Sequence, residues 1–352
     1  MQTEVVKINS LHPEPEIIEK AVTYIRQGKL VAIPTETVYG IAADYHNSES
    51  MRKLYEVKSR PLDKPFTIAV SDKDAIERLS VDAGLLAYKF ADKFWPGPLT
   101  LVLEGPNNKT VGLRMPNNTV ALRIIEAAAT DVALPSANLA GYKPAQEAAE
   151  ALQALEGKID LIVDSGRVEL GVESTVVDLS VSPFRIVREG VIKKEALERT
   201  AALKRILFVC TGNSCRSVMA QGLLTKALHQ MQRFDIEASS AGVSALNGLG
   251  ATQETLALLA KEGIDLSRHT SRRTSKIMLK SSDLILAMDD VHQMRILELA
   301  PSVGKRLYLL KEFAHIADGN LNIGDPIGQG EDFYKNTFYT IKEAVQKIAS
   351  LL

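Results

Sequence analysis

The sequence predicts an α/β protein of two domains, and three observations lead to this prediction. The 352 residues exceed the size at which one hydrophobic core usually divides. Short apolar strands alternate with helices, and in the second half this alternation is typical of a doubly wound parallel sheet. A polar helical stretch without a glycine-rich spacer lies near residue 200. We therefore expect domains at 1–195 and 204–352, joined by a linker at 196–203.

The composition is that of an ordinary globular protein. The 42 basic and 43 acidic side chains give a net charge of -1, which argues against bulk attraction to nucleic acid or to an anionic membrane. No run of about eighteen apolar residues occurs, and the N-terminus lacks an apolar signal core. Both cysteines lie in one loop, so no disulfide framework is expected. These features predict a cytoplasmic protein without a membrane segment.

The first half opens with alternating helices and strands. Helices are expected at 14–27 and 48–57, and buried strands at 30–33 and 66–70. The polar, turn-forming block Pro34–Gly40 follows the first strand directly, which is where a site belongs. After the second helix, Lys58 and Arg60 enter a proline-stiffened loop. Two such cations suit an oligophosphate or a carboxylate, although a solvated helix end is the commoner interpretation of this pair.

Seven short blocks follow one another in a fixed order across this half. They are PTETVYG, KSRP, WPGPLT, VGLRMP, SANLAG, ESTVVD and VREG. Each is weak alone, but in succession they resemble the YrdC-like threonylcarbamoyl-AMP synthases over residues 10–195. The resemblance implies an open, twisted α/β sheet with a positively lined concave face. It also implies that L-threonine, bicarbonate and ATP are joined with release of pyrophosphate, for modification of adenosine 37 in tRNAs that read ANN codons.

The resemblance also assigns site residues. Lys58 and Arg60 would hold the ATP phosphates and the carbamate, offsetting charge as the carbamate oxygen attacks the α-phosphorus. Thr35 and Arg114 would hold threonine and the intermediate. The remaining ATP and threonine contacts would come from Tyr39, Ser136, Asn138, Ser174 and Arg188. Mg²⁺ is expected through substrate phosphates, not in a metal site of the protein.

Two positions depart from the family pattern. Ala69 and Asn117 stand where many relatives carry a histidine. The threonine contacts are therefore less firmly assigned than the phosphate contacts. The product would pass to a tRNA-modifying transferase complex, and the sequence leaves open whether this domain itself contacts tRNA.

In the second half, strands and helices again alternate. Strands are expected at 206–209, 283–288 and 306–310, and helices after 216 and at 254–261, 291–300 and 331–352. The loop that follows the first strand places several backbone N–H groups and a helix N-terminus around one point, which makes an anion site. This field favours the thiolate of Cys210, which we expect to be nucleophilic. Arg216 can bind two phosphate oxygens, and Ser217 can donate a hydrogen bond to the sulfur. The phosphate loop is completed by Thr211, Gly212, Asn213, Ser214 and Cys215.

This loop closely resembles that of the low-molecular-weight protein tyrosine phosphatases, and Asp325-Pro326 is similar to their general-acid loop. The resemblance implies that Cys210 attacks phosphorus while Asp325 protonates the leaving group. Water, assisted by Asp325, would then hydrolyse the cysteinyl-phosphate. The phosphoprotein substrate stays open between phosphotyrosine and phosphoarginine. Ser214, and Ile327 after Asp-Pro, favour phosphoarginine slightly.

Three alternative interpretations compete with these two resemblances. Thiol-coupled arsenate reductases need a cysteine pair outside the loop, and the chain has no further cysteine. The first half could be a non-catalytic module that binds double-stranded RNA or a nucleotide. The second half could be a catalytically silent domain that senses or docks phosphate. The preferred interpretation is a bifunctional enzyme.

Overall fold

The chain divides into two compact units, Met1–Thr200 and Ala201–Leu352. The computed structural model describes residues 2–139, 141–316 and 319–352, so Met1 of the predicted first domain and Ala140 of the SANLAG block lie outside the described residues. The division between the units falls inside helix α7, Lys194–Ala202, which spans the predicted linker.

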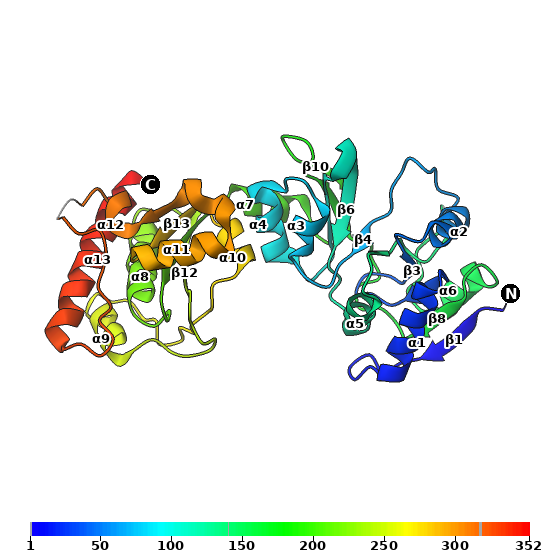
Figure 1. Cartoon of the computed structure of the whole chain (residues 1–352), viewed down its shortest axis with the longest axis horizontal. Helices are drawn as coiled ribbons and strands as arrows, with labels where there is room; N and C mark the ends of the chain where they lie inside the picture. Colours follow the sequence, from blue (N-terminus) through cyan, green and yellow to red (C-terminus); the bar gives the residue numbers. More distant parts are fainter. Residues whose placement is uncertain (1, 140, 317–318) are drawn as a thin grey trace. The chain divides into compact units, whose positions relative to one another are not determined.

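The first unit is built on a ten-stranded mixed sheet with helices against it (Figure 1). The strand order is β1-β8-β2-β3-β7-β4-β6-β5-β9-β10. The strands are β1 Glu4–Lys7, β2 Val31–Ile33, β3 Gly40–Asp44, β4 Ile68–Ala69, β5 Leu99–Glu104, β6 Thr110–Arg114, β7 Val132–Ala133, β8 Leu161–Asp164, β9 Thr175–Asp178 and β10 Arg185–Arg188. Parallel and antiparallel pairs are mixed, as in β1–β8 and β2–β3. The predicted α/β class is confirmed.

Helices cover both faces of the sheet around β2 and β8. The helices of this unit, besides α7, are α1 Pro15–Arg26, α2 Ser48–Lys58, α3 Ala75–Leu79, α4 Gly84–Phe94, α5 Thr119–Ala128 and α6 Ala148–Leu155. Successive strand residues point to opposite faces. Val31 and Ile33 therefore pack with α1 and α5, whereas Ala32 packs with α2 and α6. The predicted helices at 14–27 and 48–57 are confirmed, but the strand expected at 66–70 is only two residues long.

The sheet around β5 and β6 has one apolar face and one face of small side chains. Leu99, Leu101 and Leu103 of β5 are buried, and α4 packs against this strand. The intervening Thr100 and Val102 point to the opposite face, and Thr110 and Gly112 of β6 also lie on that face. This alternation leaves room for a cavity.

The second unit is a four-stranded parallel sheet in the order β12-β11-β13-β14, confirming the predicted doubly wound arrangement. Its strands are β11 Lys204–Cys210, β12 Ile236–Gly242, β13 Leu284–Ala287 and β14 Leu307–Leu309. Its helices are α8 Arg216–Gln230, α9 Gln253–Lys261, α10 Lys276–Lys280, α11 Asp290–Leu299, α12 Leu310–Phe313 and α13 Glu331–Leu351. Phe208 of β11 packs with α8, α9 and α13, and Leu207 with α10 and α11.

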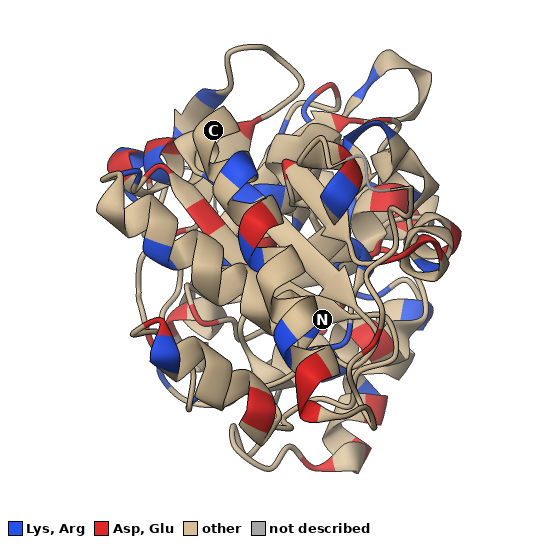
Figure 2. Cartoon of the chain, turned by 90° about the vertical axis from the view of Figure 1, so that its left-hand side faces the viewer, with Lys and Arg blue, Asp and Glu red and all other residues tan. Residues whose placement is uncertain are grey.

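Charged residues are mixed over the molecule. On the side drawn in Figure 2, Lys and Arg are interspersed with Asp and Glu along the helices. None of the described helices is long and apolar enough to cross a membrane. Within the same residues, no group of three or more His, Cys, Asp or Glu side chains is placed to hold a metal ion.

Candidate active sites

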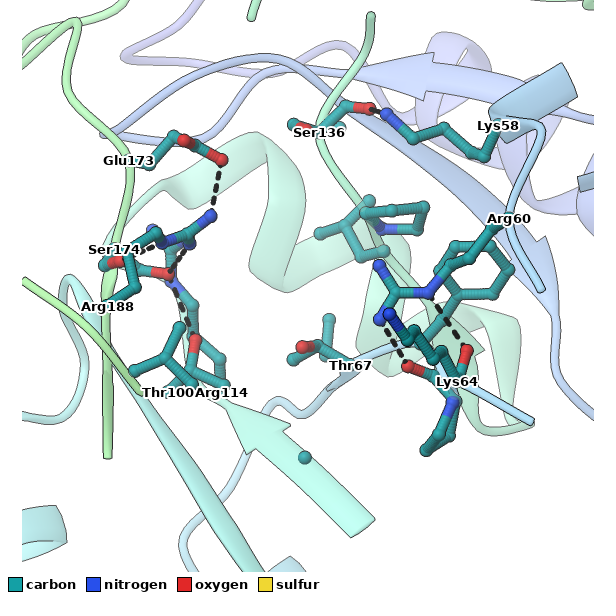
Figure 3. Close-up of a pocket in the computed structure, with 18 of the residues that line it drawn as sticks. Lys58, Arg60, Lys64, Thr67, Thr100, Arg114, Ser136, Glu173, Ser174 and Arg188 are labelled. Atoms are coloured by element: carbon teal, nitrogen blue, oxygen red, sulfur yellow. Dashed lines mark hydrogen bonds and ion pairs between the residues drawn. The ribbon is translucent and has the colours of Figure 1, made fainter. Parts of the chain in front are cut away.

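A cavity of about 890 Å³ lies on the face of the first unit's sheet that carries small side chains (Figure 3). Thr67, Ala69, Thr100 and Gly112 contribute to its floor. Eight of the nine residues predicted as ATP and threonine contacts line it: Thr35, Tyr39, Lys58, Arg60, Arg114, Ser136, Ser174 and Arg188. The blocks that are scattered through the sequence therefore meet around one space.

Lys58, at the end of α2, is a buried and fully hydrogen-bonded cation. Its Nζ atom donates to Ser136 O (2.8 Å), Asn138 O (2.7 Å) and Asn138 Oδ1 (2.8 Å). Asn138, the ninth predicted residue, therefore lies behind Lys58. Burial lowers the pKa of Lys58 to about 8. The ammonium group fixes the backbone around Ser136 and places positive charge beside the cavity.

Arg60 lies at the rim of the cavity, opposite Arg114 and Arg188 (Figure 3). Its guanidinium donates to Lys64 O and Pro65 O, both at 2.9 Å, and stacks over the Phe66 ring at 5.0 Å from the centroid. The loop after α2 is therefore folded around its own arginine. Lys64, from the same loop, adds a second cation to this rim.

Arg114, at the end of β6, forms a buried ion pair that the sequence analysis did not anticipate. Its Nη2 atom donates to Glu36 Oε1 and to Thr37 Oγ1, both at 2.8 Å. Glu36 is only 3% exposed, and burial lowers the pKa of Arg114 despite the favourable charge of Glu36. Because the pair is desolvated, its geometry holds Arg114 in one orientation at the cavity wall.

Arg188, the last residue of β10, is oriented by Glu173 and Ser174 of the preceding ESTVVD block. Nη1 donates to Glu173 Oε1 (2.5 Å), Nε to Ser174 O (3.1 Å) and Nη2 to Ser174 Oγ (3.2 Å). Ser174 Oγ in turn contacts Thr100 Oγ1 at 3.0 Å. The predicted pair Ser174 and Arg188 thus forms one unit, together with Glu173 and Thr100.

Thr35 and Tyr39 line the cavity, and their hydroxyl groups form hydrogen bonds inside the protein. Thr35 Oγ1 donates to Val38 O at 2.6 Å, closing the turn that follows β2. Tyr39 is fully buried, and its hydroxyl donates to Gly166 O at 2.7 Å. Burial raises the pKa of Tyr39. Both hydroxyl groups therefore have partners within the protein.

The two departures from the family pattern have different structural consequences. Ala69 lines the cavity, so the absence of a larger side chain there enlarges it. Asn118, next to Asn117, caps α5 by accepting a hydrogen bond from Ala121 N at 3.0 Å. The loop at 117–118 is thus fixed as the start of a helix.

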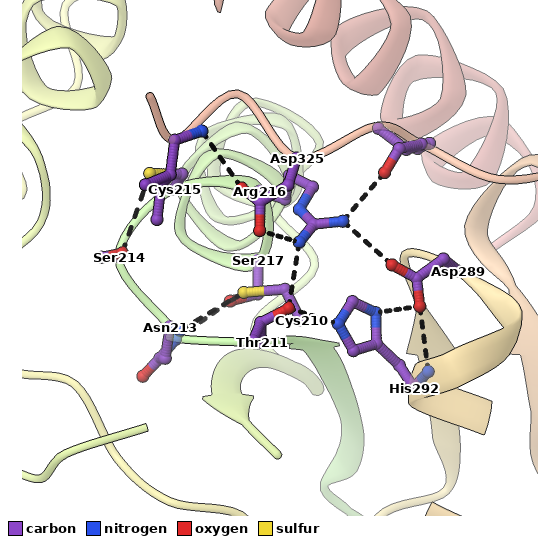
Figure 4. Close-up of polar contacts among 12 residues, drawn as sticks. Cys210, Thr211, Asn213, Ser214, Cys215, Arg216, Ser217, Asp289, His292 and Asp325 are labelled. Carbon is purple, nitrogen blue, oxygen red and sulfur yellow. Dashed lines mark hydrogen bonds and ion pairs between the residues drawn. The ribbon is translucent and has the colours of Figure 1, made fainter. Parts of the chain in front are cut away.

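The second site is the predicted phosphate loop, between β11 and α8 (Figure 4). Cys210 Sγ lies 3.0 Å from Ser217 Oγ and accepts a hydrogen bond from Asn213 N at 3.3 Å. Both groups therefore direct a polar atom at the sulfur. The donation from Ser217 predicted from sequence is consistent with this geometry.

Asn213 shapes the loop. It has a φ of 55°, in the left-handed region that Asn tolerates better than most residues. Its amide Nδ2 donates to Ser217 Oγ (3.0 Å) and Ser240 Oγ (2.8 Å), and its Oδ1 accepts from Arg272 N (2.9 Å). His269 Nε2 contacts Asn213 O at 2.8 Å. The loop is therefore braced by the segment that contains His269 and Arg272.

Arg216 is buried and bonded on both edges of its guanidinium. Nη1 donates to Asp289 Oδ2 (3.0 Å) and Ile323 O (2.9 Å). Nη2 donates to Thr211 Oγ1 (3.1 Å) and Asp325 Oδ2 (2.5 Å). The structure thus brings Arg216 and Asp325 together, although 109 residues separate them. The Asp325 side chain is 39% exposed, so it occupies the outer edge of the arginine.

The remaining loop residues face away from the Cys210 sulfur or complete the turn. Cys215 Sγ lies 3.4 Å from Thr252 Oγ1 and 3.5 Å from Tyr334 OH, and 3.7 Å from Ser214 Oγ. Burial, with the Cys215 contact, raises the pKa of Tyr334 to about 12. A Cβ atom added at Gly212 would meet only Ser214 Oγ within 4 Å, at 3.5 Å.

A cavity of about 520 Å³ adjoins this loop. Its lining is Thr211, Arg216, Val243, Ser244, Asp289, Asp290, Val291, His292, Arg295, Asn322, Ile323, Gly324 and Asp325. Three carboxylates and no Phe, Tyr or Trp are among these residues. The wall therefore suits a polar or cationic group better than a flat ring.

Asp289 and His292, which follow β13, were not among the site residues predicted from the sequence. His292 Nε2 lies 2.8 Å from Thr211 Oγ1. Burial alone would raise the pKa of Asp289, but the His292 contacts and the Arg216 charge outweigh it and hold that pKa below its ordinary value. The position of Asp289 could have indicated its role. It comes directly after an apolar strand, at the carboxyl end of the sheet where the Cys210 loop also lies.

Comparison with known proteins agrees with these two sites. A family model described as telomere recombination (Sua5, YciO, YrdC) matches residues 23–190, and that of the low molecular weight phosphotyrosine protein phosphatases matches 205–352. The threonylcarbamoyl-AMP synthase of Pyrococcus abyssi is 37% identical over 217 residues, covering 58% of this chain and 63% of that protein. The putative threonylcarbamoyl-AMP synthase of Methanocaldococcus jannaschii is 31% identical over 208 residues, covering 56% of this chain and 99% of that protein.

Among solved structures, a variant of P. abyssi Sua5 has a TM-score of 0.53 at 26% identity, covering 87% of this chain and 98% of the other. The chain spans about half to two thirds of the length of the first curated relatives it matches. The chain belongs to the Sua5–YciO–YrdC family, here joined to a domain of the low molecular weight phosphotyrosine protein phosphatase family. Both predicted resemblances are confirmed.

Proposed function

We propose that the first unit is a threonylcarbamoyl-AMP synthase, which condenses L-threonine, bicarbonate and ATP and releases pyrophosphate. The observation that carries this proposal is the meeting of eight predicted residues around one cavity of about 890 Å³. The names of the relatives support the same reaction. The product would serve tRNA adenosine-37 modification through a transferase complex.

The cations have separable roles in this proposal. Arg60 and Lys64 on one rim, with Lys58 behind it, would bind the phosphates of ATP. Arg114 and Arg188, on the opposite wall, would hold threonine and the acyl phosphate group as charge develops on the α-phosphorus. Mg²⁺ would enter on the substrate phosphates.

The test is threonine-dependent and bicarbonate-dependent pyrophosphate release from ATP, with the adenylate identified by mass. Arg188→Ala should lower turnover by about 10²-fold, since it removes charge from the reacting centre. Arg52→Ala is the matched control, because Arg52 is an exposed residue of α2 that pairs with Glu49 and Glu56. Nucleotide binding without pyrophosphate release would instead favour the non-catalytic binding module.

We propose that the second unit is a phosphatase that acts through a cysteinyl-phosphate. The carrying observation is the convergence of Cys210, Arg216 and Asp325 at the end of β11, with Ser217 and Asn213 directed at the sulfur. An incoming phosphate would take the place of Asp325 on Arg216. The displaced carboxyl group would then face the leaving group and protonate it as the S–P bond forms and the P–O or P–N bond breaks.

Phosphoarginine is the preferred substrate of this site. The cavity beside the loop is lined by Asp289, Asp290 and Asp325, and its lining has no Phe, Tyr or Trp to sandwich a phenol. Carboxylates next to the leaving group suit a guanidinium. Ser214 at the loop, noted from sequence, supports the same preference.

The test compares p-nitrophenyl phosphate, a phosphotyrosine peptide and phosphoarginine, for wild type and Cys210→Ser. Turnover that is lost in Cys210→Ser would support the thiolate mechanism, and the ranking of kcat/KM would decide the substrate. No turnover of any of the three would refute the phosphatase and favour a phosphate-docking domain.

A further inference from the structure

Arg216 is held by a closed ring of side chains that the phosphatase chemistry described above does not require. Arg216 donates to Thr211 Oγ1 and to Asp289 Oδ2. His292 connects these two partners, with Nε2 at 2.8 Å from Thr211 Oγ1 and Nδ1 at 2.9 Å from Asp289 Oδ1 (Figure 4). Because His292 is 1% exposed, water does not compete for either ring nitrogen.

The contacts define which nitrogen carries the proton. Nδ1 faces a carboxylate, although the contact lies outside the linear geometry of a hydrogen bond. In a neutral imidazole the proton therefore belongs on Nδ1, and Nε2 is left as an acceptor. The Thr211 hydroxyl then donates to His292, which leaves its lone pairs directed at Arg216.

We propose that His292 is a positioning residue for Arg216, acting through the Thr211 hydroxyl to hold the guanidinium ready for an oxyanion. This inference rests on the proposed phosphatase function, since Arg216 is the group that would bind the phosphate. Without His292 the Thr211 hydroxyl can rotate. Its oxygen can then compete with the phosphate for the hydrogen bonds that Arg216 donates. Asp289 and Ile323 O would still hold Nη1, whereas Nη2 would lose the fixed acceptor that Thr211 provides.

A role in packing alone is the alternative. His292 also begins α11, where its backbone N donates to Asp289 Oδ1 at 2.9 Å. A packing role predicts lower stability when His292 is replaced, but no specific change in how the site receives an anion. The two roles therefore differ in anion selectivity.

Alkylation of Cys210 measures that selectivity without any phosphatase turnover. In the full-length protein, iodoacetate carries a carboxylate that Arg216 attracts, whereas iodoacetamide is neutral. The ratio of the two rates at Cys210, followed by mass, should fall roughly tenfold in His292→Ala, the size of one lost hydrogen bond to a charged group. The iodoacetamide rate should stay unchanged. Met294→Ala, at an exposed position of the same helix, is the control and should keep the wild-type ratio.

Steady-state kinetics give a second measurement. With p-nitrophenyl phosphate, His292→Ala should raise KM and the inhibition constant for inorganic phosphate roughly tenfold, with a smaller change in kcat. Thr211→Val should produce a similar change, and the double variant should be no worse than either alone, because both act through one bond. His292→Gln, whose amide oxygen can accept from Thr211, should recover most of the affinity.

The outcomes are distinguishable. If wild type hydrolyses no phosphate ester, the proposed function is wrong, and the alkylation ratio still decides the role of His292. If a folded His292→Ala keeps the wild-type ratio and phosphate affinity within twofold, the positioning role is overturned. Should His292→Ala not fold, additive losses in His292→Gln and Thr211→Val would overturn it equally.

Discussion

The replacement of Gly242 by alanine should disable the phosphatase site without touching any residue that carries chemistry. Gly242 ends β12, directly beside the phosphate loop. A Cβ atom there would lie 2.5 Å from Thr211 O and 2.8 Å from Asn213 N. Ordinary contact begins at 3.4 Å, so the loop backbone must move by about 0.9 Å.

The magnitude follows from that displacement. Misplacing reacting groups by about 1 Å costs about 10²-fold in rate, and overpacking costs about 1–3 kcal/mol of stability. The assay is turnover of p-nitrophenyl phosphate, with urea denaturation to measure stability. Gly250→Ala is the matched control, since a Cβ there meets no atom within 4 Å. Turnover of Gly242→Ala within threefold of wild type would refute the argument that the loop backbone is fixed by this contact.

Three further predictions concern charged groups. Glu36→Ala leaves the Arg114 charge buried without its counterion, so urea denaturation should show the first unit destabilised by about 3–5 kcal/mol. Glu36→Gln should destabilise it by less, and equal losses in the two variants would contradict this prediction. The pKa of Lys58 is lowered to about 8 from an ordinary 10.5, so the unfolded chain binds more protons between these values. The stability of wild type relative to Lys58→Met should therefore rise from about pH 8 to 10.5, and a flat difference would count against it. Asp325→Asn should lower kcat by about 10²–10⁴-fold for a phosphotyrosine peptide and less for p-nitrophenyl phosphate, whose leaving group needs little protonation; identical losses would exclude Asp325 as the acid.

The sequence predicts the second unit well because its signals are local. The Cys210 loop needs only a strand, a tight turn and a helix. All three are predicted by residues that are adjacent in the sequence. Asp289 and His292 were not predicted as site residues, because their position at the site depends on which strand lies next to β11. Strand order is a tertiary property, and the sheet places β13, not β14, next to β11.

In the first unit, the blocks predicted the cavity residues but not their partners. Glu36 stands inside PTETVYG and Glu173 inside ESTVVD, yet neither block shows that Arg114 and Arg188 are their counterions. Pairing across such separations depends on packing and desolvation, which a linear pattern does not contain. The strand at 66–70 was predicted too long because apolar content does not reveal how short its neighbour β7 is.

The alternation along β5 and β6 gives the first unit a property useful to protein engineers. Leucines on one face form the structural layer, while Thr100, Val102, Thr110 and Gly112 on the other face border the ligand space. Substitutions at these four positions can change the volume available to a ligand in steps of one or two carbon atoms, leaving the leucine layer intact. In these two strands, one set of alternate residues therefore determines the size of the cavity, and the other set stabilises the fold.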